Sequence, residues 1–214
     1  MELWLVRHGT TRANMEGRFQ GTLPIPLGPE GRKEVLCLAE RLNEQSFSAF
    51  FCSSVLRARQ TAKLLGKKVQ DPSPLFTPLL QEYHWGIIQG LTRREIGERY
   101  PAILEQLQQD FQRAEIPGAE GIKRLFWRAG RFYRLLASLE RTGRYNLPIL
   151  IVSHGRFLQA FVQYFLAYDR RQGWPFSVSP ASLTILEGDF HGSRRLKLFN
   201  DTCHLRREGL VIKN

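Results

Sequence analysis

Met1-Glu2-Leu3-Trp4-Leu5-Val6-Arg7-His8-Gly9 opens the chain, and in this stretch an apolar run leads directly into a polar cluster. A short apolar run of this length predicts a buried strand. Two further apolar runs, Phe47–Cys52 and Ile149–Val152, are followed by polar residues in the same way. The sequence therefore predicts three buried strands, each ending in a polar loop.

Helical patterns stand between these strands. Apolar residues recur at helical spacing in Glu30–Gln45, Glu120–Arg141 and Phe157–Ala167. Ser53 and Ser54 are expected to cap a further helix that follows the second strand. Strands that alternate with helices predict an α/β fold. We expect a three-layer sandwich with a mostly parallel central sheet flanked by helices.

The remaining segments are predicted as loop, helical insertion and late strands. Pro72–Pro78 is expected to be loop. The stretch from Thr92 to about Arg113 has a helical pattern that is interrupted near Pro101, and residues from about 83 to 120 lack a strand signal. We therefore expect a helical cover, inserted at about 83–120, over the active site. Later strands are expected at Ser182–Glu187, Leu196–Phe199 and Leu205–Ile212.

Length and composition describe an ordinary globular chain. Its 214 residues are 43% hydrophobic and 24% charged. A single domain over 1–214 can therefore bury a sizeable core without disulfide bonds or structural metal ions. The apolar runs fall far short of the roughly 20 residues of a membrane span, and no secretory signal is expected at Met1–Val6. The scattered Cys37, Cys52 and Cys203 predict reduced, buried thiols in a cytoplasmic protein.

Net charge is the unusual feature of the composition. Lys and Arg number 31 against 20 Asp and Glu, which gives a formal net charge of +11. This balance favours anionic partners such as phosphates, nucleic acid or an acidic surface, and does not choose among them. A solvated basic surface explains the excess equally well. The charge alone would also suit a nucleic-acid-binding protein. We expect no nucleic-acid partner, because the sequence contains no base-stacking motif or known nucleic-acid recognition element.

Polar side chains follow three of the predicted strands. In open α/β sheets, ligands gather beyond the carboxyl ends of the strands. Arg7-His8, Arg57 and Ser153-His154 are therefore expected to meet at one edge of the sheet. Each histidine alone is more often structural. Arginine binds two phosphate oxygens at once and keeps its charge near neutral pH, so the combined set indicates a phosphate site.

Five ordered blocks of the chain resemble the histidine phosphatase superfamily, also called the phosphoglycerate mutase-like family. The blocks are Leu5-Val6-Arg7-His8-Gly9-Thr10-Thr11-Arg12-Ala13-Asn14, Arg18-Phe19-Gln20-Gly21, Ser53–Ala62, Leu80–Gly86 and Val152–Gly155. The tail Asn200–Leu205 is similar to the small-phosphatase branch. No metal or other cofactor is expected, because the histidines lack ligand spacing and acidic partners.

The resemblance implies roles for nine residues. His8 would be the nucleophile that forms a phosphohistidine, and Glu82 would be the general acid and base. Arg7, Arg57 and His154 would bind the transferring phosphoryl group. Asn14, Gln20, Gly21 and Tyr83 are expected to contact phosphate or substrate. One general acid contributes only about 10²–10⁴-fold, so preorganised positive charge must supply much of the remaining catalysis.

Departures from the family pattern leave the substrate open. Pro24 and Gly28 replace the usual Asp and Thr of a loop, and Arg156 replaces a small or apolar residue after His154-Gly155. Tyr83 stands after Glu82 where the glycolytic mutases carry an arginine. The loss of that carboxylate-binding cation favours a phosphatase for small-molecule phosphate esters. A phosphoglycerate mutase is the alternative.

Several assignments have two interpretations. Asn14 also suits a turn, and Arg12, Arg18 and Arg156 suit either the pocket or the exposed surface. We expect a structural hydrogen bond from His204. A homodimer is a further possibility for the assembly.

Overall fold

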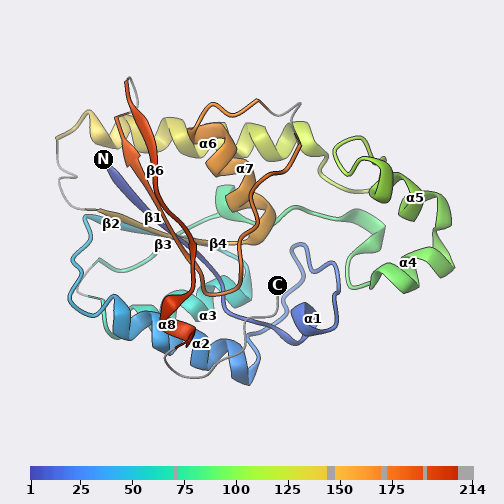
Figure 1. The fold of residues 1–214 in the computed structure, drawn as a ribbon, viewed down its shortest axis with the longest axis horizontal. Helices are drawn as coiled ribbons and strands as arrows, with labels where there is room; N and C mark the ends of the chain where they lie inside the picture. Colours follow the sequence, from blue (N-terminus) through green and yellow to red (C-terminus); the bar gives the residue numbers. More distant parts are fainter. Residues whose placement is uncertain (70–71, 144–147, 170–172, 190–191, 207–214) are drawn as a thin grey trace.

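The computed structural model describes residues 1–69, 72–143, 148–169, 173–189 and 192–206 (Figure 1). Its centre is a six-stranded sheet in the order β3-β2-β4-β1-β5-β6. The strands are β1 (Glu2–Arg7), β2 (Ala49–Ser53), β3 (Leu75–Thr77), β4 (Ile149–Ser153), β5 (Leu183–Gly188) and β6 (Arg194–Asp201). β3, β2, β4 and β1 pair in parallel, whereas β5 and β6 add antiparallel strands. The predicted mostly parallel sheet is confirmed.

Helices cover both faces of this sheet. α2 (Pro29–Arg41) and α3 (Leu56–Leu65) lie on one face, and α6 (Ile122–Glu140) and α7 (Gly155–Phe165) lie on the other (Figure 1). Side chains of a strand alternate between faces. Leu3 and Leu5 accordingly join the core under α6 and α7, while Val6 joins the core over α2 and α3. The three-layer sandwich is confirmed, with one apolar core on each side of the sheet.

The cores follow from the periodicity of the two long helices. α6 buries the stripe Leu125, Phe126, Ala129, Phe132, Tyr133 and Leu136, at the spacing expected of one helix face. α7 is buried over most of its circumference because the sheet and the neighbouring α6 both pack against it. The apolar stripe thus decides which helix face meets the sheet.

Shorter helices connect these layers. They are α1 (Arg12–Met15), α4 (Arg93–Arg99), α5 (Pro101–Gln109) and α8 (Cys203–Arg206), with 3₁₀ turns at Pro78–Leu80 and Gly86–Ile88. α4 and α5 lie within the range 83–120 and lie apart from the two main helix layers (Figure 1). α4 ends before Pro101 and α5 begins there, as the sequence predicts. None of the described helices is long and apolar enough to span a bilayer.

Three predictions about local structure are wrong. Pro72–Pro78 contains the edge strand β3, which is too short to show a periodic pattern. Val55, not Ser53 or Ser54, is the N-cap of α3, because the Ser53 hydroxyl bonds to His154 and the Ser54 hydroxyl accepts from Gln81. A strand at Leu205–Ile212 is also wrong at its start, since Leu205 and Arg206 belong to α8. Residues 207–212 lie outside the described part.

The cysteines differ in their burial. Cys52 is buried and Cys37 is partly buried, but Cys203 is exposed at the start of α8. The expectation that all three thiols are buried is therefore wrong for Cys203. Cys52 and Cys203 are free thiols in the structure.

Candidate active site

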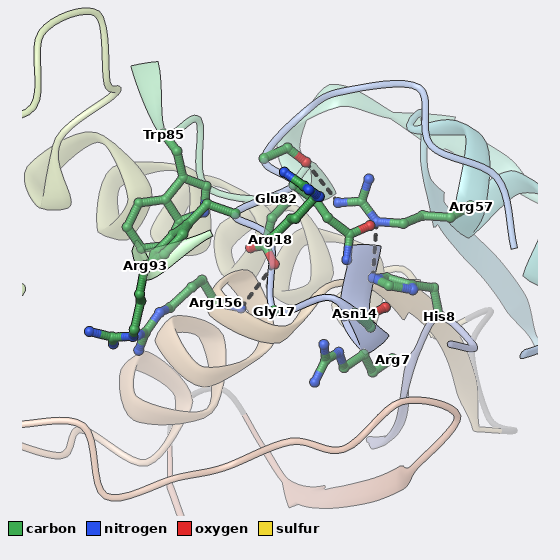
Figure 2. Close-up of a pocket in the computed structure, with 13 residues that line it drawn as sticks. Arg7, His8, Asn14, Gly17, Arg18, Arg57, Glu82, Trp85, Arg93 and Arg156 are labelled. Atoms are coloured by element: carbon green, nitrogen blue, oxygen red, sulfur yellow. Dashed lines mark hydrogen bonds between the residues drawn. The ribbon is translucent and has the colours of Figure 1, made fainter. Parts of the chain in front are cut away.

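The strands β1, β2 and β4 end together, and a cavity of about 190 Å³ opens beside their carboxyl ends (Figure 2). The backbone N–H of His8 donates to the Ser153 carbonyl at 3.0 Å, which joins the two histidine-bearing loops. Seven of the nine predicted residues line the cavity: Arg7, His8, Asn14, Gln20, Gly21, Arg57 and Glu82. Parallel pairing therefore brings together residues that are up to 75 positions apart in the chain.

His8 is held as a neutral imidazole with a defined tautomer. Its Nδ1 lies 2.8 Å from the Gly9 carbonyl, which can only accept a hydrogen bond. Its Nε2 receives the Nε–H of Arg57 at 3.0 Å. The proton is thus on Nδ1, and the lone pair is on Nε2. Burial, followed by the charges of Arg57 and Arg7, lowers the pKa of His8 well below its ordinary value of 6.5.

α2 fixes the loop that carries His8. Glu34 accepts hydrogen bonds from both the backbone N–H and the hydroxyl of Thr10, at 2.7 Å each. A Cβ on Gly31 would lie 2.0 Å from the Thr10 carbonyl oxygen, and a Cβ on Gly9 would lie 2.4 Å from the Gly31 oxygen. Glycine at both positions lets helix and loop approach closely and sets the position of the imidazole.

Arg57 is a buried cation, and each of its three guanidinium nitrogens donates a hydrogen bond. Nη1 donates to the Leu23 carbonyl at 3.1 Å and Nη2 donates to the Gly21 carbonyl at 2.7 Å, while Nε reaches His8. Burial lowers the pKa of Arg57 to about 10, against the opposing effect of Glu82. The guanidinium stays charged at neutral pH. Gly21 therefore contributes its carbonyl to the orientation of Arg57, in addition to lining the cavity.

Arg7 and His154 present buried nitrogen atoms that have no hydrogen-bond partner within the described residues. Arg7 Nη1 donates to the Val178 carbonyl, but Arg7 Nε has no partner. His154 is fully buried, and its ring centroid lies 5.1 Å from that of His8. Its Nε2 bonds to the Ser53 hydroxyl at 2.7 Å, and its Nδ1 has no partner. An unpaired buried polar group is costly, so both atoms are suited to a ligand oxygen.

Asn14 and Gln20 combine local structure with cavity lining. Thr11 caps α1, and its backbone N–H donates to the Asn14 side-chain oxygen at 3.0 Å. The Thr11 hydroxyl also lies 2.9 Å from the Gln20 side-chain oxygen. Since Thr11 engages both amide oxygens, the amide N–H groups are the donors that Asn14 and Gln20 can direct into the cavity. The turn and pocket interpretations of Asn14 are therefore compatible.

Glu82 faces the beginning of α7. Its carboxylate accepts a hydrogen bond from the backbone N–H of Phe157 at 3.2 Å. It accepts another from the backbone N–H of Arg156 at 3.3 Å (Figure 2). The first N–H groups of a helix lack partners within the helix, and the helix dipole favours an anion there. The same helix end follows His154, so α7 links the second histidine to the carboxylate.

Arg128 is a site residue that sequence reasoning missed. Its guanidinium, buried on α6, donates to the carbonyls of Leu79 and Gln81 at 2.8 Å and to that of Glu82 at 3.4 Å. It also pairs with Glu120 at 2.6 Å. The sequence did carry a signal for this residue, because Arg128 is a charged residue within the apolar stripe of α6. Arg128 is a positioning residue that holds the loop bearing Glu82.

Tyr83 is placed differently from the prediction. It is 3% exposed, and its ring packs 4.8 Å from Trp85 and 5.6 Å from Phe111. Its side chain does not line the cavity, where Trp85 stands instead. The burial of Tyr83 follows from this aromatic cluster, which takes the apolar ring out of water.

The structure also places the arginines and the histidine for which the sequence left two interpretations or predicted a structural role. Arg18 and Arg156 line the cavity, as does Arg93, which the sequence analysis did not single out. Arg12 is exposed and pairs with Glu16. The structural hydrogen bond of His204 is confirmed, since its Nε2 lies 3.0 Å from the Ala181 carbonyl. Among the described residues, no three His, Cys, Asp or Glu side chains are grouped as metal ligands.

Fold and site together define an α/β enzyme of phosphoryl transfer, with paired histidines and arginines at the carboxyl ends of parallel strands. A family model described as "Histidine phosphatase superfamily (branch 1)" matches residues 3–202. The chain therefore belongs to the histidine phosphatase superfamily, branch 1. This confirms the resemblance found in the motifs.

The chain is similar to proteins whose names give different activities. The chain is 33% identical over 161 residues to a metal-independent phosphoserine phosphatase of Arabidopsis thaliana, covering 74% of this chain and 66% of the relative. It is 29% identical to 2,3-bisphosphoglycerate-dependent phosphoglycerate mutase 2 of Gloeobacter violaceus, covering 75% and 73%. The crystal structure of a putative alpha-ribazole-5'-P phosphatase from Escherichia coli superposes with a TM-score of 0.83 at 27% identity, covering 94% and 98%.

Proposed function

We propose that this enzyme hydrolyses phosphate monoesters of small molecules through a phosphohistidine on His8. The observation that carries the proposal is the tautomer of His8, whose unprotonated Nε2 lies in a pocket lined by arginines. A nucleophile must offer a lone pair, and preorganised cations must stabilise the phosphoryl oxygens. Both conditions are met around one imidazole.

In the first step, Nε2 of His8 attacks phosphorus in line with the ester oxygen. The N–P bond forms as the P–O bond breaks, and Glu82 gives its proton to the departing oxygen. The Arg57 Nε–H donates a hydrogen bond to the lone pair on His8 Nε2. This lone pair must be free to attack phosphorus, so Arg57 must first turn its N–H to a phosphoryl oxygen. Arg7 Nε and His154 Nδ1 supply further donors, and the amides of Asn14 and Gln20 complete the set.

In the second step, water replaces His8 on phosphorus. The Glu82 carboxylate takes a proton from this water, the P–O bond forms, and the N–P bond breaks to release phosphate and restore His8. Glu82 is half-buried and lines the cavity, so one carboxyl can serve both steps.

Phosphate release from a panel of esters at mildly acidic pH tests this function. We expect wild type to release phosphate and His8→Ala to lose at least about 1,000-fold in kcat, the order seen when a nucleophile is removed. His204→Gln, which removes a histidine outside the cavity, is the matched control and should keep its activity. An acid-labile phosphoenzyme should form in wild type only. Equal release by wild type and His8→Ala would refute the proposal.

A phosphoglycerate mutase is the competing function, and the same protein can test it. A mutase must keep its intermediate away from water, whereas a phosphatase must admit water. With 3-phosphoglycerate and a bisphosphate primer, we expect hydrolysis to exceed isomerisation. Isomerisation well above hydrolysis would identify a mutase and reject the phosphatase.

Location and assembly belong to the same proposal. An odd number of widely spaced cysteines supports a reducing compartment, and we propose the cytoplasm. We also propose a homodimer, which light scattering on the purified chain tests directly. A single species with the mass of one chain would exclude the dimer.

A further inference from the structure

A second cavity, separate from the candidate active site, opens between α6, α7 and the start of β6. It encloses about 520 Å³, which lies within the range of roughly 300–1,000 Å³ that is typical of small-molecule sites. Its lining residues are Lys123, Phe126, Trp127, Tyr133, Gln163, Tyr164, Ala167, Tyr168 and Arg194. None of these residues lines the active-site cavity.

The two cavities lie at opposite ends of α7. His154 directly precedes the first residue of α7, whereas Gln163 stands two residues before the last. The eight residue steps from Gly155 to Gln163 correspond to about 12 Å along the helix axis. α6 packs beside α7 (Figure 1). A small ligand can therefore occupy the second cavity without contact to His8.

Aromatic rings form much of the wall of the second cavity. Five of its lining residues are aromatic: Phe126, Trp127, Tyr133, Tyr164 and Tyr168. The rings of Tyr133 and Tyr164 lie 5.4 Å apart, and the ring of Tyr168 packs 5.7 Å from Phe176. Trp127 is 54% exposed, although burial of so large an apolar ring is strongly favourable. The wall therefore offers ring faces on which a planar group can stack.

Two cations, Lys123 and Arg194, stand at the rim of the cavity. Lys123 is exposed and Arg194 is half-buried. The Arg194 guanidinium lies 5.2 Å from the centre of the Tyr133 ring, and its Nη1 donates to the Phe165 carbonyl at 3.1 Å. These contacts restrain the cation but leave its charge in place. Neither cation forms an ion pair within the described residues.

Acidic groups stand nearby but outside the lining of the cavity. Burial raises the pKa of Tyr133 against the effect of Arg194, and the charges of Glu140 and Asp189 raise that pKa further. Glu140 already pairs with the amino terminus of Met1 at 3.2 Å. Neither carboxylate lines the cavity. The lining residues therefore present positive charge to a ligand.

Gln163 adds an independent sign of a missing ligand. Its side chain lines the cavity and is 1% exposed. Its Nε2 has no hydrogen-bond partner within the described residues. The other side chains that α7 buries are apolar. Buried polar groups are nearly always paired, and an amide N–H can only donate. An acceptor atom of a ligand would supply the partner that this N–H lacks.

We propose that the second cavity binds a planar aromatic ligand that carries an anionic group. The ring system stacks on the aromatic wall. Arg194 and Lys123 bind the anionic group, and Gln163 donates to an acceptor atom of the ligand. Each part of the ligand thus corresponds to a separate observation. The site is distinct from the phosphatase site and does not depend on the chemistry of His8.

Three related compounds test this site. 2-Naphthoate is a planar aromatic anion, 2-naphthamide is its neutral counterpart, and decahydronaphthalene-2-carboxylate is its saturated, non-planar counterpart. Proton–nitrogen-15 NMR follows the indole N–H of Trp127, which lines this cavity, and that of Trp85, which lines the active site. Trp127→Phe and Trp85→Phe identify the two signals. We expect 2-naphthoate to shift the Trp127 signal and to bind at least about 10-fold more tightly than either counterpart.

Variants then assign the binding to named groups. Arg194→Gln removes a cation and should weaken 2-naphthoate binding by about 5- to 10-fold. Gln163→Leu removes the unpaired donor at similar volume and should weaken binding by about 3- to 10-fold without unfolding the chain. Arg195→Gln is the matched control, because Arg195 is the next residue of β6, is exposed and does not line the cavity. Its affinity should equal that of wild type.

The outcomes decide the site without reference to catalysis. If 2-naphthoate leaves the Trp127 signal unchanged, or shifts only that of Trp85, the proposal is overturned. Equal affinity for all three compounds also overturns it, because neither planarity nor charge would then matter. Unchanged affinity in both Arg194→Gln and Gln163→Leu overturns it as well. Since no measurement uses phosphate release, a failure here leaves the proposed phosphatase intact, and a failure of the phosphatase leaves this site intact.

Discussion

At the scale of single residues, two hydrogen bonds prepare His8 for chemistry. The Gly9 carbonyl holds the Nδ1 proton, and Arg57 directs an N–H at Nε2. A cation beside the ring also opposes protonation of the ring. The same arginine thus keeps the proposed nucleophile neutral, and in the proposed reaction it then binds the phosphoryl group.

The protonation state of His8 gives a direct prediction. Because burial and two arginines lower its pKa well below 6.5, the imidazole should remain neutral at pH 6, with the proton on Nδ1. Nitrogen-15 NMR of labelled histidine measures both properties, and His8→Gln identifies the signal. A cationic ring at pH 6, or a proton on Nε2, would contradict this account of the nucleophile.

At the scale of elements, helix ends and helix faces aim the reacting groups. The start of α7 holds Glu82 through two backbone N–H groups. α6 holds the preceding loop through Arg128, whose donors reach three backbone carbonyls. The position of Glu82 therefore depends on two helices that pack against the same face of the sheet.

Arg128→Met should separate the positioning of Glu82 from the stability of the chain. The variant leaves the carboxylate of Glu120 buried without its cation, and breaking a buried pair in this way costs about 3–5 kcal/mol. We also expect kcat to fall at least about 10-fold with little change in KM, because the loop that carries the proton donor loses its anchors. Denaturant unfolding and steady-state kinetics measure the two effects.

The double variant Arg128→Met/Glu120→Gln provides the control. Removing the second charge should restore much of the stability, since no buried carboxylate is left unpaired. It should not restore kcat, because the three carbonyls still lack their donor. A double variant with wild-type kcat would show that Arg128 acts only on stability.

At the scale of the whole molecule, buried histidines couple folding to pH. Burial lowers the pKa of His8 and His154 well below 6.5 and that of His204 to about 4. Below pH 6.5 the unfolded chain therefore binds protons that the folded chain does not. By linkage, the free energy of unfolding falls as the pH decreases from about 6.5 towards 4. The raised pKa of Glu120 acts in the opposite direction.

His204→Gln isolates one part of this dependence. Each lowered histidine contributes about 1.4 kcal/mol of destabilisation per pH unit below 6.5. Between pH 7 and pH 5, wild type should lose more stability than His204→Gln, by up to about 2 kcal/mol. Denaturant unfolding at the two pH values measures the difference. Equal losses in the two proteins would exclude His204 as a source of acid sensitivity.

Local sequence signals were enough for much of the fold and for most of the site. Apolar runs located β1, β2 and β4, and helical spacing located α2, α6 and α7, because both signals arise from burial within one element. The sequence placed Arg7, His8 and Arg57 after strands, and the parallel pairing brought them together. It missed β3, whose three residues form no period, and it placed a strand over α8.

The sequence by itself determined the fold class and the candidate reacting groups, since periodicity sets the buried faces and residue type sets the possible chemistry. Only the tertiary structure decided which side chains share the pocket. In the folded chain, Tyr83 is buried against Trp85, and Trp85 lines the cavity in its place. Arg128 lies on the predicted apolar face of α6 and donates hydrogen bonds to the loop that carries Glu82. Arg93 and Arg156 line the same pocket. These outcomes depend on contacts between distant segments, where packing and charge pairing follow from the three-dimensional arrangement and leave no local pattern in the chain.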